Sequence, residues 1–230
     1  INVIKVDATH FLADELKEAA RNCGYQATDD YDGAINEGIA PVQVAIESGA
    51  RCSSARAYLD SVARNRGNLV IEKNALAQKI DFDGKHARRV VYEKNGQTFT
   101  ADVKGEIILC GGAYNSPQLL MLSGIGPAGD LTALGVPLLH DLKGVGANLQ
   151  EHVRLPNQFN AELPNSFREQ LRFDRAAFSF LNWMFFRRGP FANQIASGML
   201  LVKTDPALDR PDIQIMISPV RVDANIWFPG

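Results

Sequence analysis

The sequence is poor in cysteine and histidine, and this scarcity excludes two kinds of site. Its 230 residues contain three cysteines, which lie far apart and form no C-x-x-C pair: Cys23, Cys52 and Cys110. Their number and spacing indicate neither a disulfide framework nor a zinc site. The four histidines include no two at metal-ligand spacing. Unpaired cysteines suit a reducing compartment, so we expect a cytoplasmic location.

An excess of one charge and a long hydrophobic run are also absent. Twenty-four basic and 26 acidic residues give a formal net charge of −2, so no basic surface for nucleic acid is indicated. The longest apolar run, Ala176 to Phe186, is interrupted by Ser179 and Asn182. It is shorter than the roughly 20 residues of a membrane-spanning helix. We therefore expect no nucleic-acid partner, and the sequence does not indicate membrane association.

What remains is an ordinary globular composition. Hydrophobic residues make up 46% and charged residues 22% of the chain, which excludes disorder, collagen and a coiled coil. The length suits one large domain or two small ones. The chain opens with Ile1 instead of methionine and ends at Gly230 without a tail-like composition, so we expect an internal piece of a longer protein.

Hydrophobic periodicity and turn residues predict a mixed α/β chain. Helices are expected from Thr9 to Cys23, from Ser53 or Ser54 to Arg64, after Ser116-Pro117, from Asp130 to Leu134 and from Asp174 to Arg188. Strands are expected at 69–71, 77–82, 89–92, 97–103, 106–110, 136–140, 199–202 and 213–217. Asp83-Gly84 and Asn95-Gly96 are hairpin-type turn signals, so the strands before Val103 should form an antiparallel layer.

The segment from Glu106 to Pro117 has the order strand, glycine turn, helix. Its compact apolar run, Glu106 to Cys110, suits a strand buried on both faces. Gly111, Gly112 and Ala113 follow and are candidate cofactor contacts, because small residues at a strand end let a ligand approach the backbone. Close packing of the strand on the helix explains each glycine equally well. Cys110 is expected to be a buried inert thiol, although a reactive thiol is conceivable there.

A second glycine pattern, Gly124 to Gly129, literally spells G-x-G-x-x-G. A dinucleotide fingerprint needs a strand before it and a helix after it. Here a helix precedes the pattern, and Pro127 removes a backbone N–H. We interpret the pattern as a helix end followed by a turn.

Several ordered stretches resemble the glucose–methanol–choline (GMC) flavin oxidoreductases. Residues 112–126 fit the family's second signature over fifteen positions. Residues 51–59 resemble R-x-S-S-x-x-x-Y-L, residues 68–71 N-L-x-V, residues 106–113 E-V-I-L-S-A-G-A, and residues 144–152 G-V-G-x-N-L-Q-D-H, while Asp32-Gly33 and Gly189-Pro190 fall at plausible positions between them. The resemblance runs from about residue 32 to about residue 218.

The chain departs from the family pattern at a few positions. Cys110 and Gly111 stand where Ser and Ala are commoner, Lys143 replaces Pro, and Glu151 replaces Asp. Ala77 stands where the family usually has Val, whose backbone meets the adenine of FAD. A backbone contact tolerates this change, so the resemblance implies FAD contacts at six residues: Ala77, Cys110, Gly111, Gly112, Ala113 and Asn148.

The resemblance implies an enzyme that oxidises a primary alcohol to an aldehyde by hydride transfer to flavin. The implied partners are a small-molecule alcohol and either oxygen or a quinone as electron acceptor. In the family, an active-site His paired with His or Asn removes the hydroxyl proton. No histidine follows His152, and no strand-linked glycine fingerprint precedes residue 50. We therefore expect a central fragment without a catalytic residue, and a structural role suits His152 better than that of the base.

Two alternatives to this function stay open. The parent protein could be a hydroxynitrile lyase-type member that keeps FAD, or the chain could be a non-catalytic fragment. The expected domains are 1–45, a substrate-domain segment and connector; 46–150, part of a doubly wound FAD-binding domain; and 151–230, part of a substrate domain with antiparallel sheet and helices. Ile213, Ile215 and Ile217 suit an apolar wall or a core equally well.

The aromatic helix expected at 174–188 has two interpretations. Aromatics at helical spacing usually pack, so we expect core or a substrate-domain lid. A hydrophobic patch for a membrane or a quinone-linked partner is the alternative, which Arg187-Arg188 at the helix end slightly favours.

Overall fold

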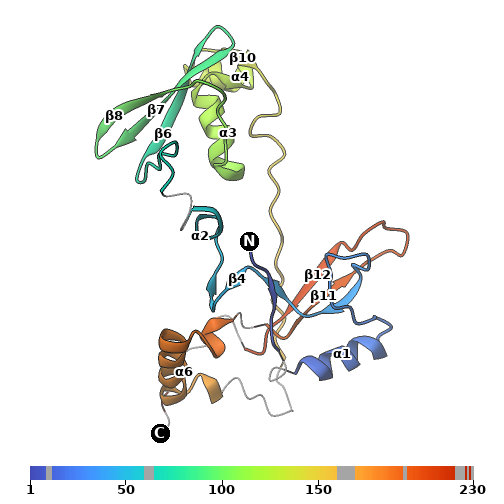
Figure 1. The fold of residues 1–230 in the computed structure, drawn as a ribbon. Coiled ribbons are helices and arrows are strands. Elements are labelled where there is room, and N and C mark those ends of the chain that lie inside the picture. Colours follow the sequence, from blue (N-terminus) through green and yellow to red (C-terminus); the bar gives the residue numbers. More distant parts are fainter. Residues whose placement is uncertain are drawn as a thin grey trace. The chain divides into compact units, whose positions relative to one another are not determined.

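The computed structural model describes residues 1–8, 12–59, 65–159, 169–193 and 196–220, and the single residues 226 and 228. The chain divides into two compact units (Figure 1). Unit 1 combines Ile1–Gly67 with Pro156–Gly230, and unit 2 is Asn68–Leu155. The two units differ in their bounds from the predicted domains, and compactness alone does not show what each part binds. The assignment of 1–45, 46–150 and 151–230 to FAD-binding and substrate-binding parts stays a prediction.

Unit 1 contains small antiparallel sheets and three α-helices within its described residues. Its elements are β1 Ile4–Lys5, α1 Ala13–Asn22, β2 Gly38–Ala40, β3 Gln43–Val44, β4 Ile46–Glu47, β5 Ala50–Arg51, α2 Ser54–Leu59, α6 Phe173–Phe186, the 3₁₀ turn η2 Pro190–Ala192, β11 Gly198–Val202 and β12 Ile213–Ile217. The order β12-β11-β2 makes a three-stranded sheet, and β1 pairs with β3 and β4 with β5. Residues from both ends of the chain thus share one sheet.

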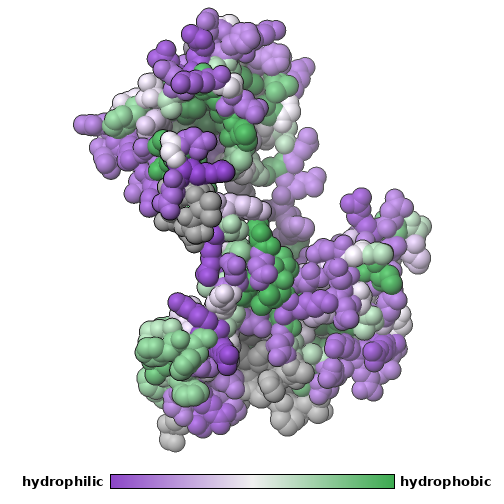
Figure 2. All heavy atoms as spheres, viewed as in Figure 1, coloured by the Kyte–Doolittle hydropathy of each residue, from purple (hydrophilic) through white to green (hydrophobic). Residues whose placement is uncertain are grey.

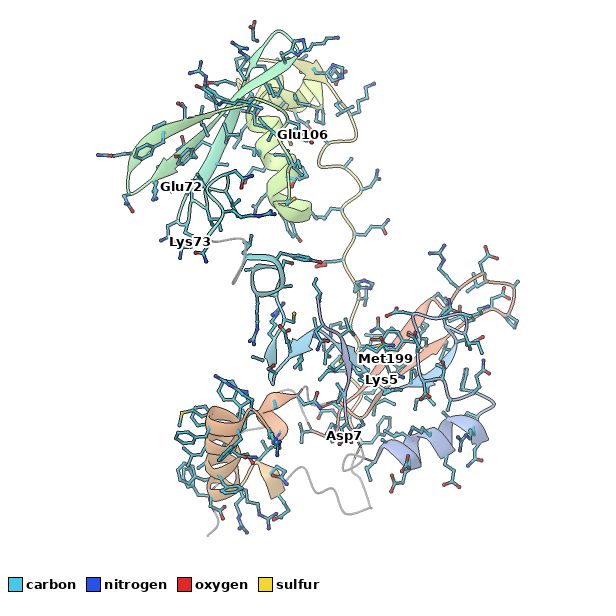
Figure 3. The ribbon with its side chains drawn as sticks, in the orientation of Figure 1. Lys5, Asp7, Glu72, Lys73, Glu106 and Met199 are labelled. Carbon is cyan, nitrogen blue, oxygen red and sulfur yellow. The ribbon has the colours of Figure 1, made fainter. Side chains whose placement is uncertain are left out.

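The core of unit 1 lies where this sheet meets the segment after β1. Val6, Val42, Ala196 and Met199 are buried together, with Tyr31, Val44 and Leu201 packed against them. Met199, labelled in Figure 3, comes from the central strand β11. This cluster explains why β11 is the apolar strand that the sequence predicts at 199–202.

Unit 2 begins with a three-stranded antiparallel meander. Its elements are β6 Leu76–Asp83, β7 His86–Lys94, β8 Gln97–Asp102, α3 Gly112–Leu122, β9 Ile125–Gly126, α4 Ala128–Ala133 and β10 His140–Asp141. β7 pairs with β6 and β8, whereas β9 and β10 form a short parallel pair. The turn at Asn95-Gly96 lies where the sequence predicts it, and the first turn, Gly84-Lys85, lies one residue after the predicted Asp83-Gly84. Asn95 and Gly96 have φ of 54° and 75°, the left-handed pair that a tight two-residue hairpin turn requires.

The predicted α/β character and most helices are confirmed. α1 ends at Asn22, with Cys23 as its C-cap, close to the predicted end at Cys23, and Gly24 follows at φ 87°. α2 begins at Ser54. Thr9 and residues 60–64, which belong to the same two predictions, lie outside the described residues. No helix in the described part of the chain is both long and apolar enough to cross a membrane.

Two strand predictions are wrong. Residues 69–71 and 106–110 lie in irregular backbone, and Val70 and Ile108 are 80% and 73% exposed. Glu106, labelled in Figure 3, opens the second of these segments, which leads along the chain into α3. An apolar run becomes a strand only when a neighbouring strand satisfies its backbone. None of the described strands pairs with either segment.

Two helix starts and one buried face also differ from the prediction. α3 begins at Gly112, so Pro117 lies inside it, and α6 begins at Phe173 with Arg172 as N-cap in place of Asp174. β12 exposes nearly all its residues, so the prediction of one buried face is wrong for this edge strand. Of residues 136–140, only His140 is in a strand.

Candidate functional site

All six candidate cofactor contacts lie in unit 2 and are exposed. Ala77 belongs to β6, and Cys110 to Ala113 form the entry to α3. Asn148 follows the glycine-rich loop after β10. Exposure of Cys110 contradicts the expected buried thiol, because the strand that was to bury it does not form. The candidates therefore lie at the start of α3, on strand β6 and after the glycine-rich loop.

The entry to α3 is a tight glycine turn. Gly111 is the N-cap, and its N–H donates to Ser116 Oγ at 3.0 Å. A Cβ at Gly111 would lie 3.1 Å from Asn115 Cβ and 3.2 Å from the Ser116 N, so a larger residue would crowd the first turn. Gly112 has φ 82°, which only glycine adopts at low cost. The turn therefore needs glycine at position 111 because space is tight, and at position 112 because of the backbone conformation.

The first backbone N–H groups of α3 come directly after this turn in the chain. The first turn of any helix leaves donors without an intrahelical acceptor, and it is electrostatically positive. At α3 these donors begin at Gly112 and Ala113, both exposed. The turn can therefore offer backbone hydrogen bonds to the oxygens of a ligand. Ser116, expected to precede the helix, instead fixes the turn from inside it.

The glycine-rich loop packs on the side of α3. A Cβ at Gly146 would lie 3.6 Å from Met121 Sδ and 4.0 Å from Pro117 Cβ. The backbone holds the loop in place, since Leu142 N–H donates to Gly126 O at 3.0 Å. The loop then leads to Asn148, which has φ 57°. This contact brings the 144–152 stretch and the 112–126 stretch together. The two motifs, read separately in the sequence, could not show that they meet.

β6 is fixed to the other end of α3 by one serine. Ile80 N–H donates to Ser123 Oγ at 2.8 Å, and Ser123 Oγ donates to Leu119 O at 2.6 Å. Ala77 lies on the same strand, beside a register shift between Ala77 and Lys79. Sequence reasoning missed Ser123, because a serine at a helix end gives no sign of its partner on a distant strand.

The described histidines lie on separate segments of unit 2. His86 opens β7, His140 opens β10, and His152 lies in irregular backbone; all three are exposed. His10 lies outside the described residues. Within the described ranges, no three His, Cys, Asp or Glu side chains gather closely enough to hold a metal ion.

The G-x-G-x-x-G pattern at 124–129 occupies a helix end, a two-residue strand and the start of α4. Gly124 has φ 85°, and a Cβ there would lie 2.5 Å from Pro137 O. α3 precedes the pattern, as the sequence predicted. Gly124 and Gly126 serve the close approach of the chain around β9 and β10, whereas a Cβ at Gly129 would meet no atom within 4 Å.

Comparisons with known proteins identify relatives over most of the chain. The chain is 39% identical over 212 residues to an oxygen-dependent choline dehydrogenase of Stenotrophomonas maltophilia strain K279a, covering 91% of this chain and 38% of the relative. It is 37% identical over 216 residues to one of Staphylococcus aureus strain MSSA476, covering 94% and 37%. The chain thus spans well under half the length of these relatives.

Solved structures share the fold. An FAD-dependent oxidoreductase from Chaetomium thermophilum is 26% identical with a TM-score of 0.67, over 82% of this chain and 34% of that one. A formate oxidase is 20% identical with a TM-score of 0.71, over 86% and 35%. The family model described as GMC oxidoreductase matches residues 1–154. This match covers more than half of the chain, and the chain therefore belongs to the GMC oxidoreductase family.

Proposed function

We propose that this chain is the central part of an FAD-dependent enzyme that oxidises a primary alcohol to an aldehyde. The observation that carries the proposal is the exposed glycine turn at the start of α3, with the 144–148 loop packed on the same helix. Both belong to the family motifs, and the family model extends over both. Relatives at 39% and 37% identity are named oxygen-dependent choline dehydrogenases.

The residues around α3 fit an extended cofactor with many acceptor oxygens. Gly112 and Ala113 would offer backbone N–H groups to those oxygens, since they lie in the first turn of a helix. Cys110, Gly111 and Asn148 would line the same approach. Ala77 would contribute backbone from the exposed strand β6, where a small side chain leaves the backbone accessible.

FAD, when bound, would supply the hydride acceptor of the reaction. The described residues of this chain would bind and orient the cofactor, since they hold turns and donors in fixed positions. No histidine follows His152 in this chain, so we propose that the proton is removed by a residue elsewhere in the longer protein. A base must reach the hydroxyl proton at hydrogen-bond distance.

The substrate proposal is a small primary alcohol of the choline type, and the acceptor proposal is oxygen. Both rest on the relatives' names, and a quinone remains the alternative acceptor. We also propose that 46–150 contributes to FAD binding and that 1–45 and 151–230 contribute to the substrate side. A cytoplasmic location is proposed on the free state of Cys23, Cys52 and Cys110.

Anaerobic flavin bleaching in the full-length protein tests this function. The protein is mixed with choline and with a series of primary alcohols, and its visible spectrum is followed. Substrate-dependent loss of the oxidised flavin bands, with formation of the aldehyde, is expected. A flavin that stays oxidised with every alcohol would contradict the dehydrogenase and would favour the lyase-type alternative.

A further inference from the structure

Ser123 joins the end of α3 to the edge of β6 in unit 2. Ile80 N–H donates to the Ser123 hydroxyl at 2.8 Å, and the same hydroxyl donates to Leu119 O at 2.6 Å. β6 pairs with β7 along one edge, so this N–H lies on the other edge of the strand. Since Ile80 is 5% exposed, the serine is the group that satisfies its donor. The end of α3 therefore takes the place that a neighbouring strand would occupy at Ile80.

Apolar packing around α3 does not by itself fix the position of the helix along β6. α3 lies against β6, and Leu119, Leu120 and Met121 are half-buried. Figure 2 shows hydrophobic residues, in green, over the part of unit 2 that contains this helix. Burial of apolar surface is non-directional, whereas a hydrogen bond to one backbone N–H has a fixed direction. The Ser123 contact is therefore the one that sets the register of α3 on β6.

α3 is a rigid spacer between this contact and the glycine turn. Gly112 opens the helix and Ser123 is its C-cap, so about 16 Å of helix separates them. On β6, Ala77 lies about 10 Å along the strand from Ile80. The pairing with β7 shifts register between Ala77 and Lys79, so the ladder holds this end of β6 less regularly. Ser123 thus links the glycine turn to the Ala77 segment through one helix.

We propose that Ser123 is a positioning residue for FAD, which holds the glycine turn and the Ala77 segment at the separation that one extended ligand needs. The inference rests on the proposed function, because it takes both segments as contacts of the cofactor. A ligand that touches two segments binds tightly only when the protein already holds them in place, since otherwise binding must also order them. Ser123 lies at the far end of α3 from the glycine turn, so it acts on the cofactor through these two segments.

Titration of the full-length apoprotein with FAD tests this role, with the flavin spectrum as the readout. Ser123→Ala should raise the dissociation constant about tenfold, because the link to β6 is lost. Ser123→Thr and Ser123→Val have the same shape and differ in the hydroxyl, so the threonine variant should bind FAD like the parent and the valine variant should not. The matched control is Thr204→Ala, which removes a hydroxyl that donates to Asp212 at 2.6 Å in unit 1. It should keep the parent's dissociation constant.

Urea unfolding must show every variant folded under the conditions of the titration, and the threonine and valine pair decides if Ser123→Ala does not fold. Parent-like FAD affinity in the alanine or valine variant would overturn the inference and leave the proposed function standing. Equal weakening by Ser123→Thr and Ser123→Val, or by Thr204→Ala and Ser123→Ala, would overturn it too, because the hydroxyl at position 123 would not be the cause. A parent apoprotein that binds no FAD would contradict the proposed function itself, and this inference with it.

Discussion

At the residue scale, the candidate site depends on a few left-handed positions. Gly112, Gly146 and Asn148 have φ of 82°, 76° and 57°. Glycine and asparagine are the residues that adopt this region most readily, so the sequence could identify the turns. It could not show that Gly146 contacts Pro117 and Met121, because that contact joins segments far apart in the chain.

Replacement of Gly112 by alanine tests the turn. Since φ is 82° while a Cβ there would meet no atom within 4 Å, the cost comes from the backbone alone. We expect Gly112→Ala to lower the free energy of unfolding by about 1 kcal/mol and to weaken flavin retention in the full-length protein. The control is Gly129→Ala inside α4, where a Cβ also meets nothing and alanine should stabilise by up to about 1 kcal/mol. Equal urea midpoints for the two variants would contradict this account.

Asp174 should titrate at unusually low pH. The hydrogen bonds from Arg172 lower the pKa of the Asp174 carboxyl from 3.8 to about 2. Because the folded pKa lies below the unfolded one, the stabilising contribution of this group is complete above pH 3.8 and is lost as the pH falls through about 2. Carboxyl NMR of the chain should give that midpoint, and Arg172→Gln should move it toward 3.8. A parent midpoint already near 3.8 would show that the ion pair does not form.

At the scale of elements, local signals predicted the meander and most helices, and tertiary partners decided the rest. β6 to β8 form because tight turns bring their neighbours alongside. Residues 106–110 carry as strong a strand signal, but no described strand supplies their hydrogen bonds. The aromatic spacing of α6 likewise predicted an amphipathic helix without showing which face Gly49 and Trp183 would anchor.

The serine between α3 and β6 is the element-scale contact that most needs a test. Ile80 is 5% exposed, so its N–H has no water to replace Ser123 Oγ. Ser123→Ala should lower the free energy of unfolding by about 1–3 kcal/mol and speed amide exchange at Ile80. Ser116→Ala removes the acceptor of an exposed N–H and should cost less. A larger loss for Ser116→Ala would refute this assignment of the contact.

At the scale of the whole molecule, much apolar surface is left uncovered. In unit 2 the buried hydrophobic residues are Ile80, Val91 and Leu131 among the described residues. β12, an edge strand of the unit 1 sheet, is exposed along most of its length. The relatives are more than twice as long, with the chain spanning 38% and 37% of them. We infer that the remainder of a longer protein pairs with 106–110 and completes the sheets.

The second of the two segments that connect the units, around Leu155 and Pro156, should be the first point of proteolysis in the isolated chain. Residues 151–159 have no regular structure, and Val153 and Leu155 are 87% and 83% exposed. Limited trypsin digestion should therefore cut after Arg154 well before Arg89, which is held in β7 between two strands. Mass spectrometry of the early fragments identifies the site. Cleavage after Arg89 at the same rate would contradict the division into units.

The flavin-to-protein ratio after gel filtration tests the central claim most directly, namely that this chain supplies part of an FAD site. The ratio is measured from the visible spectrum for the full-length protein and for the 230-residue chain, each first incubated with FAD. The account predicts stoichiometric flavin on the full-length protein and almost none on the chain alone. Stoichiometric flavin on the isolated chain, or none on the full-length protein, would contradict it.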